Sequence, residues 1–224
     1  MSRTRLFVRL FGFIATAFGL TGVLLFGAAG SLRWPQAWVF LTILIALMGS
    51  GASYLAVVSP DLIERRMHVR EKEAPQKVIA WLGLAAFALE LILAGLDFRF
   101  DWYAASTRVV VVGDIAVIAG YVVLFLSLRE NPWAARNIAI EPGQTVVSTG
   151  LYAVVRHPMY LGVMLIYGSA PLALGSYWAL LPALFLLSLV IARTVNEEQV
   201  LLRDLAGYRE YMDRVRWRLV PWIW

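Results

Sequence analysis

Long apolar blocks decide what this chain can fold into. The first block, LFVRLFGFIATAFGLTGVLLFGAAG (residues 6–30), contains a single charged side chain. A helix of about 20 such residues crosses the roughly 30 Å hydrocarbon core of a bilayer. The chain is 60% hydrophobic, against about 45–50% in soluble domains. The sequence therefore predicts an all-α, polytopic integral membrane bundle, in which this first block is a retained span and not a cleaved signal peptide.

Six segments have the composition of membrane spans. They are residues 7–29, 34–58, 78–96, 108–128, 159–174 and 177–193. The last two are short, and only Gly175 and Ser176 separate them. They form either a helical hairpin or one broken re-entrant element, so we expect five to six transmembrane helices. The chain then divides into four N-terminal spans (1–128) and a C-terminal region (129–224).

The basic residues lie mainly on one side of the predicted spans. Of the 20 Lys and Arg, only Arg33, Arg99 and Arg108 fall in the loops of the other side. The rest lie in the N-terminus, in loops 59–77 and 129–158, and in the C-terminal tail. The positive-inside rule places these segments and both termini in the cytoplasm.

Composition also excludes several functions. The net charge of +5 reflects the cytoplasmic loops of a membrane protein, and we expect no nucleic-acid partner. The chain has no cysteine and only two histidines, His68 and His157. We therefore expect neither disulfides nor a metal site.

The tail, residues 195–214, is predicted as a separate amphipathic helix. Its apolar side chains recur at spacings of four and three residues: Leu201, Leu205, Tyr208, Met212 and Val215. One turn earlier the same stripe reaches Glu197. We expect Glu197, with Glu198 beside it, to point toward the bundle. Such a carboxylate binds a cationic or amino group of a ligand, or alternatively caps the tail helix or pairs with an arginine.

A polar cluster, VVRHPMYLG (residues 154–162), stands just before an apolar span. Pro158 suits the first turn of a helix, which places Arg156 and His157 at a helix N-terminus. That end of a helix favours an anion, and an arginine adds a bidentate donor for a carboxylate or phosphate. The competing interpretation is an arginine that reaches lipid headgroups.

The loop 129–152 is polar and broken by proline and glycine, yet too apolar for disorder. We predict an ordered lid over a cytoplasmic pocket, with Asn131, Trp133 and Tyr152 facing it. The alternative is a connector that packs on the membrane surface.

Two acidic residues lie within predicted spans, Glu90 in the third and Asp114 in the fourth. We expect a structural role, with protonated carboxyl groups that hydrogen bond to each other. The alternative is a path for a transported ion or solute.

Two motifs together carry a family resemblance. STGLYAVVRHPMYLG, followed after the last span by NEEQVLLRDLAGYREYMDRV, resembles the isoprenylcysteine carboxyl methyltransferase (ICMT) family and is similar to phospholipid N-methyltransferases. The resemblance covers residues 129–224, and the SPDLIERRM loop is like that of bacterial members. It implies a helical enzyme of the bacterial inner membrane that binds S-adenosylmethionine without a Rossmann domain and releases S-adenosylhomocysteine.

The resemblance also implies the site residues. Those expected to bind the cofactor are Arg156, His157, Pro158, Tyr160, Gly162, Glu197, Glu198, Tyr208 and Tyr211; those expected to act in catalysis are Arg156, His157 and Glu197. An arginine suits the cofactor's carboxylate, a glutamate its ammonium, and the aromatic side chains its sulfonium or adenine. His157 is the one nearby imidazole that could accept a proton from an amine.

The sequence thus predicts an S-adenosylmethionine-dependent methyltransferase. Its acceptor is a carboxylate, thiol or amine of a small or lipophilic molecule, such as a membrane lipid, that enters from the bilayer. The alternatives are an NADPH-dependent membrane reductase of the sterol-reductase type and a non-catalytic membrane protein or transporter. The acceptor and the oligomeric state stay open.

Overall fold

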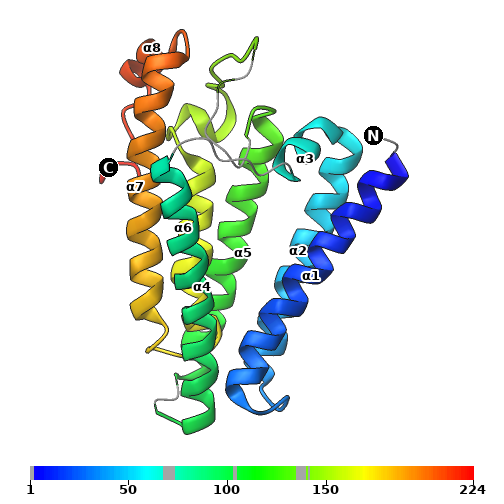
Figure 1. Cartoon of the computed structure of the whole chain (residues 1–224). Coiled ribbons are helices and arrows are strands. Elements are labelled where there is room, and N and C mark those ends of the chain that lie inside the picture. The colour runs from blue at the N-terminus through cyan, green and yellow to red at the C-terminus, as the bar shows by residue number, and fades with distance from the viewer. Residues whose placement is uncertain (1–2, 68–73, 103–104, 135–139, 141) are drawn as a thin grey trace.

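The protein is a bundle of long helices (Figure 1). The computed structural model describes all residues except 1–2, 68–73, 103–104, 135–139 and 141. Within them the elements are α1 (Arg3–Ala29), α2 (Pro35–Val58), α3 (Pro60–Met67), α4 (Ala74–Phe100), α5 (Thr107–Glu130), the 3-10 helix η1 (Gly150–Ala153), α6 (Pro158–Ala173), α7 (Leu180–Asp204) and α8 (Tyr208–Arg214). The described part of the chain has no strand beyond one isolated bridge between Val155 and Trp217. The predicted all-α fold class is confirmed.

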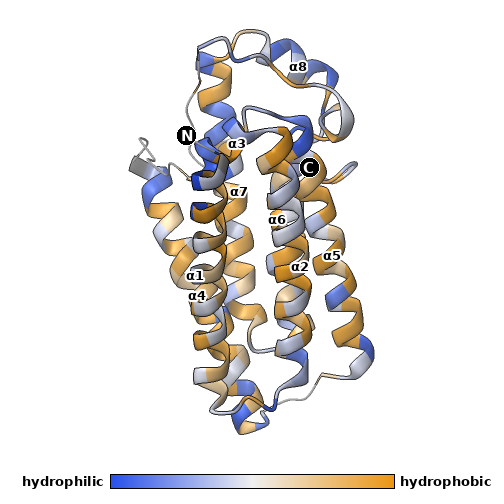
Figure 2. Ribbon diagram, turned by 90° about the vertical axis from the view of Figure 1, so that its right-hand side faces the viewer, coloured by the Kyte–Doolittle hydropathy of each residue, from blue (hydrophilic) through white to orange (hydrophobic). Residues whose placement is uncertain are grey.

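In the described part of the chain, five helices are long and apolar enough to cross a membrane: α1, α2, α4, α5 and α7. The sixth, α6, has 16 residues and is about 24 Å long at 1.5 Å per residue. Apolar residues cover the middle of the bundle and polar residues gather at its two ends (Figure 2). Because large apolar side chains such as those of Val8, Trp81 and Leu184 are exposed, this surface matches the lipid of a bilayer and the protein is an integral membrane protein.

The predicted tail helix is wrong in its boundaries. The last span does not end at residue 193, because α7 runs on to Asp204. Neither proline nor glycine interrupts residues 183–206, so the backbone hydrogen bonds continue through Glu197 and Glu198. The break comes at Gly207, whose φ of +80° belongs to the left-handed region. The predicted apolar stripe still packs together, since Leu205, Tyr208 and Val215 are buried in one cluster that Leu201 borders.

Helices α5 and α6 pack with their backbones in contact. A Cβ added to Gly162 would lie 2.6 Å from the carbonyl oxygen of Gly120 and 2.7 Å from the backbone nitrogen of Leu124. Small residues allow this approach, which is a common way for membrane helices to associate. The contact holds the N-terminal end of α6 beside the C-terminal end of α5.

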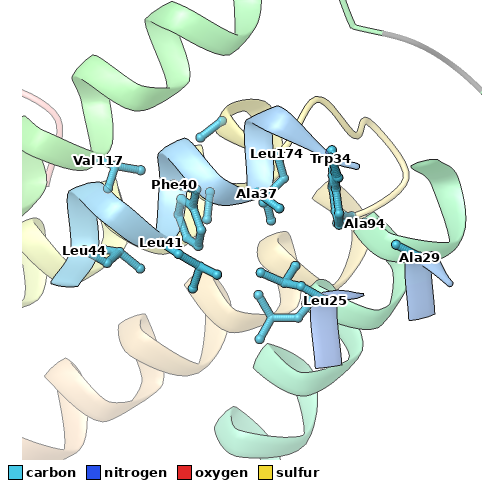
Figure 3. Packing of buried hydrophobic residues seen from close by; sticks show 14 residues of the cluster. Leu25, Ala29, Trp34, Ala37, Phe40, Leu41, Leu44, Ala94, Val117 and Leu174 are labelled. Carbon is cyan, nitrogen blue, oxygen red and sulfur yellow. The ribbon is translucent and has the colours of Figure 1, made fainter. Parts of the chain in front are cut away.

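Two apolar clusters join α1 and α2 to the other helices. The larger one contains Leu25, Trp34 and Phe40, with Val117 of α5 and Leu174 after α6 (Figure 3). It fills the half of the bundle away from α8. The other cluster brings the α3 residues Leu62 and Ile63 together with Leu6 and Leu55, and with Ala134 of the loop after α5. The short helix α3 therefore anchors that loop at the end of the bundle that carries α8 (Figure 1).

Candidate active site

A cavity lies at the end of the bundle that carries α8. The space between its lining side chains is about 830 Å³, a volume that includes open solvent. Its walls come from the loop after α5, the start of α6, the second half of α7, and α8. The lining side chains are Asn131, Trp133, Ala134, Ile140, Gln144, Thr145, Val146, Val147, Tyr152, Arg156, His157, Met159, Tyr160, Arg193, Glu197, Leu201, Leu205, Tyr208 and Tyr211.

The N-terminus of α6 is held by the end of the chain. His157 is the N-cap of the helix and Pro158 is its first residue. At this first position the missing backbone N–H of proline is no loss. The N–H groups of Arg156 and His157 donate to the carbonyl oxygens of Trp217 and Arg218, each at 2.9 Å. The tail thus fixes the direction in which Arg156 and His157 leave the backbone.

Beneath the cavity, a buried cluster of charges centres on Glu198. Arg156 Nε donates to Glu198 Oε1 and Arg218 Nε to Glu198 Oε2, each at 2.6 Å. Arg156 Nη1 also donates to the carbonyl oxygens of Val215 and Arg216, each at 2.8 Å. The side chains of Arg156 and Glu198 are each only 5% exposed. Arg156 is therefore held rigidly, with Nε and Nη1 engaged inside the protein.

His157 joins this cluster to the cavity wall. Its Nε2 lies 3.3 Å from Glu198 Oε1 and 3.5 Å from the hydroxyl of Tyr208. Its ring stacks on that of Tyr160, with centroids 5.7 Å apart.

A second polar group, of Glu197, Tyr160 and Arg193, faces the cavity itself. The hydroxyl of Tyr160 donates to Glu197 Oε2 and accepts from Arg193 Nε at 3.0 Å. Glu197 is half-buried, whereas Glu198, the next residue, is almost fully buried. Adjacent glutamates on one helix point in different directions, so one carboxylate serves the buried cluster and the other serves the cavity.

The loop after α5 supplies the opposite wall. Asn131 Oδ1 accepts from the backbone N–H of Trp133 at 2.9 Å, and Asn131 also hydrogen bonds to the side chain of Tyr152. Tyr211 donates to the carbonyl oxygen of Tyr152 at 2.7 Å. Burial raises the pKa of Tyr152 to about 12.

The tyrosines of α8 close the cavity on the tail side. Burial, then the charges of Glu198 and Glu197, raise the pKa of Tyr208 well above its usual value. The pKa of Tyr211 is raised by burial first and by the nearby Tyr152 second. Both side chains are thus neutral hydroxyl groups at physiological pH.

The structure brings most of the predicted site residues to one place. The members that line the cavity are Asn131, Trp133, Tyr152, Arg156, His157, Tyr160, Glu197, Tyr208 and Tyr211. Pro158, Gly162 and Glu198 are not among the lining residues. Pro158 starts α6, Gly162 packs against α5, and Glu198 pairs with two arginines. These residues therefore support the site without lining the cavity.

Sequence reasoning missed Arg193 as a cavity residue. The sequence indicates only a basic residue at the end of the predicted last span, residues 177–193. Arg193 lies one helical turn before Glu197, a spacing that places both side chains on the same face of a helix. The lining residues Gln144, Thr145 and Met159 carried no such periodic signal.

The two intramembrane acids do not form the predicted pair. Among the described residues, α4 packs against α1, α6 and α7, while α5 packs against α2 and α6. Neither oxygen of Glu90 has a hydrogen-bond partner in that part of the chain, nor does Asp114 Oδ1. The expectation that Glu90 and Asp114 bond to each other on facing helices is therefore wrong, because their helices are not neighbours.

Comparisons with known proteins agree with this architecture. Residues 108–206 match the family model described as phospholipid methyltransferase. The fold is similar to the solved structure of the eukaryotic intramembrane Ras methyltransferase ICMT, with a TM-score of 0.56 and 19% sequence identity over 93% of this chain and 75% of that chain. The matched region, which is less than half of the chain, and the shared fold support the resemblance to ICMT-like and phospholipid methyltransferases. The resemblance predicted from the sequence is confirmed.

A further relative belongs to another class of enzyme. The chain is 29% identical over 106 residues to the mouse Delta(14)-sterol reductase TM7SF2. The match covers 44% of this chain but spans only 25% of the reductase.

Proposed function

We propose that this protein is an S-adenosylmethionine-dependent methyltransferase that acts on a lipophilic acceptor. The observation that carries the proposal is the cavity, in which a carboxylate, two arginines and several aromatic rings converge inside the region that matches the phospholipid methyltransferase family. The cytoplasmic site and cytoplasmic termini belong to the same proposal and rest on the distribution of basic residues. The bacterial inner membrane is also part of it and rests on the resemblance of the sequence to bacterial members.

The chemistry of the lining side chains fits this cofactor. S-adenosylmethionine carries an ammonium, a carboxylate, an adenine and a sulfonium whose methyl group is electrophilic. Glu197 would hold the ammonium, and Arg156 and Arg193, with the positive end of α6, would attract the carboxylate. Tyr208, with Tyr160, Tyr211 and Trp133, offers aromatic faces to the adenine and the sulfonium.

The residues of the site contribute mainly position and charge. Displacement at a methyl group needs an aligned acceptor, which the protein supplies by orientation. A carboxylate or thiolate acceptor needs no strong base. An amine acceptor would need a base, and the imidazole of His157, which lines the cavity, is the candidate for that role.

The lining explains why the acceptor should be lipophilic. Ile140, Val146, Leu201 and Leu205 add an apolar surface to the cavity, and the site lies at the end of membrane-crossing helices. An acceptor with a long apolar part would therefore remain in the bilayer while its polar group enters the cavity.

Isothermal titration of the purified protein with S-adenosylhomocysteine tests the proposal. We expect binding by the wild type and at least about tenfold weaker binding by Glu197→Gln, the factor that 1.4 kcal/mol represents. Glu210→Gln, which changes an exposed glutamate of α8, is the matched control and should bind like the wild type. Absence of binding by the folded wild type would refute the proposal.

A second candidate is an NADPH-dependent reductase, because of the similarity to the mouse sterol reductase. The phosphates of a dinucleotide would also need the arginines and the helix N-terminus of this site. Thermal unfolding separates the two functions. Protection by NADPH without protection by S-adenosylhomocysteine would favour the reductase.

A further inference from the structure

The short helix α3 contacts the cavity wall through two arginines. Arg65 Nη2 donates to the carbonyl oxygen of Pro132 at 2.9 Å, and its guanidinium lies 5.6 Å from the centre of the Trp133 ring. Arg66 Nη1 donates to the carbonyl oxygen of Ala134 at 2.9 Å. Three consecutive residues of the loop after α5 are therefore held by two consecutive residues of α3.

Arg66 also contacts a second wall of the cavity. Its Nη1 lies 3.7 Å from the sulfur of Met159, in the first turn of α6. Met159, Trp133 and Ala134 all line the cavity, whereas Arg65 and Arg66 do not. The two arginines would thus act on a ligand only through the residues that they hold.

The base of α3 is firm enough to serve as an anchor. Leu62 and Ile63 are buried in the apolar cluster that also contains Ala134, and the helix follows α2 directly, after Ser59. Helix α3 lies outside the region that matches the phospholipid methyltransferase family, which begins at residue 108. It is where the N-terminal part of the chain reaches the site.

We infer that Arg65 and Arg66 are positioning residues, which hold the wall formed by residues 131–134 so that Asn131 and Trp133 face the bound ligand. A guanidinium that donates to a backbone carbonyl forms a charge-assisted hydrogen bond, stronger than a neutral one. The aromatic contact of Arg65 adds an attraction to the face of the Trp133 ring. Loss of these contacts should loosen the wall while the membrane helices keep their packing.

The inference rests on the proposed function only for its effect on ligand binding, so two measurements are needed. The first is hydrogen–deuterium exchange of the purified protein. In Arg66→Ala and in Arg65→Ala/Arg66→Ala, the amides of Trp133 and Ala134 should exchange about tenfold faster, and those within α7 should not change. Arg203→Ala, which removes an exposed arginine paired with Asp204, is the matched control.

The second measurement is titration with S-adenosylhomocysteine. Arg66→Ala should weaken binding about tenfold, and Arg66→Lys, which keeps a charged donor, should recover part of the loss. Unchanged exchange of the amides of Trp133 and Ala134 in both alanine variants would overturn the inference. If the wild type does not bind S-adenosylhomocysteine, the proposed function fails, and exchange alone still decides whether the arginines hold the wall.

Discussion

The most informative perturbation is Glu198→Gln, because it removes the charge that balances two arginines. The side chain of Arg156 is 5% exposed, so the variant leaves an uncompensated buried charge. Breaking a buried pair in this way costs about 3–5 kcal/mol. The side chain of Arg218 is one-third exposed, so water compensates much of the loss of its ion pair with Glu198. The glutamine side chain also retains one carbonyl acceptor for Arg156. We therefore expect a destabilisation near the lower limit, about 3 kcal/mol.

This destabilisation can be measured as a shift of the unfolding temperature. For a chain of 150–250 residues, 1 kcal/mol shifts Tm by about 2–4 °C. Glu198→Gln should thus lower Tm by about 6–12 °C, followed by tryptophan fluorescence of the protein in detergent. Glu197→Gln is the matched comparison, because Glu197 is half-buried at the cavity. It should change Tm by no more than about 2–4 °C, the shift for 1 kcal/mol, while weakening ligand binding.

The comparison of the two variants tests the assignment of the two carboxylates. A Tm of Glu198→Gln within 2 °C of the wild type, a margin set by about 1 kcal/mol, would show that Arg156 does not depend on Glu198. The reasoning about the buried cluster would then be refuted. A larger loss of stability in Glu197→Gln than in Glu198→Gln would reverse the assignment.

Two further predictions follow from the packing and the burial of the site. Gly162→Ala would press a methyl group against the backbone of Gly120 and should destabilise the protein by about 1–3 kcal/mol. The control is Gly168→Ala, whose added methyl group meets only the side chain of Leu187 at 3.5 Å. Equal Tm values for both variants would contradict the close contact between α5 and α6. The pKa values of Tyr152, Tyr208 and Tyr211 in the folded protein lie above the unfolded value of 10.0, so the folded state binds more protons than the unfolded state above pH 10. The contribution of these side chains to stability is therefore fully present below pH 10 and falls as the pH rises toward 12. Tyrosinate absorbance should show these side chains ionising late, together with unfolding; ionisation of all tyrosines near pH 10 in the folded protein would contradict their burial.

Much of the fold could be predicted because its signals are local. Long apolar runs mark membrane helices, and Pro158 marks the start of α6, since both depend on neighbouring residues alone. The predicted stripe also packs together, with Leu205 and Tyr208 buried and Leu201 partly buried against them. The boundary between α7 and the tail could not be predicted, because charged residues such as Glu197 and Glu198 are typical of the end of a span, whereas the structure keeps them within α7 at the site.

The sequence could not predict that Glu197 lines the cavity while Glu198 pairs with buried arginines. The sequence favoured Glu197 as the inward residue, but Glu198 is the more buried of the two. Its partners include Arg218, 20 residues further along the chain. Likewise Arg65 and Arg66 carried only the signal of a basic loop, yet they hold a wall of the cavity 67 and 68 residues away.

The sequence by itself therefore determined an all-helical membrane protein, the start of α6 and the kinds of side chain available for a cofactor site. Apolar length, helix period and proline placement act over a few residues and leave little choice. Only the tertiary structure decided which charges balance each other beneath the cavity and which face it. Those choices depend on burial and on partners distant in sequence, because a charge in a low-dielectric interior persists only where the folded chain supplies its counter-charge.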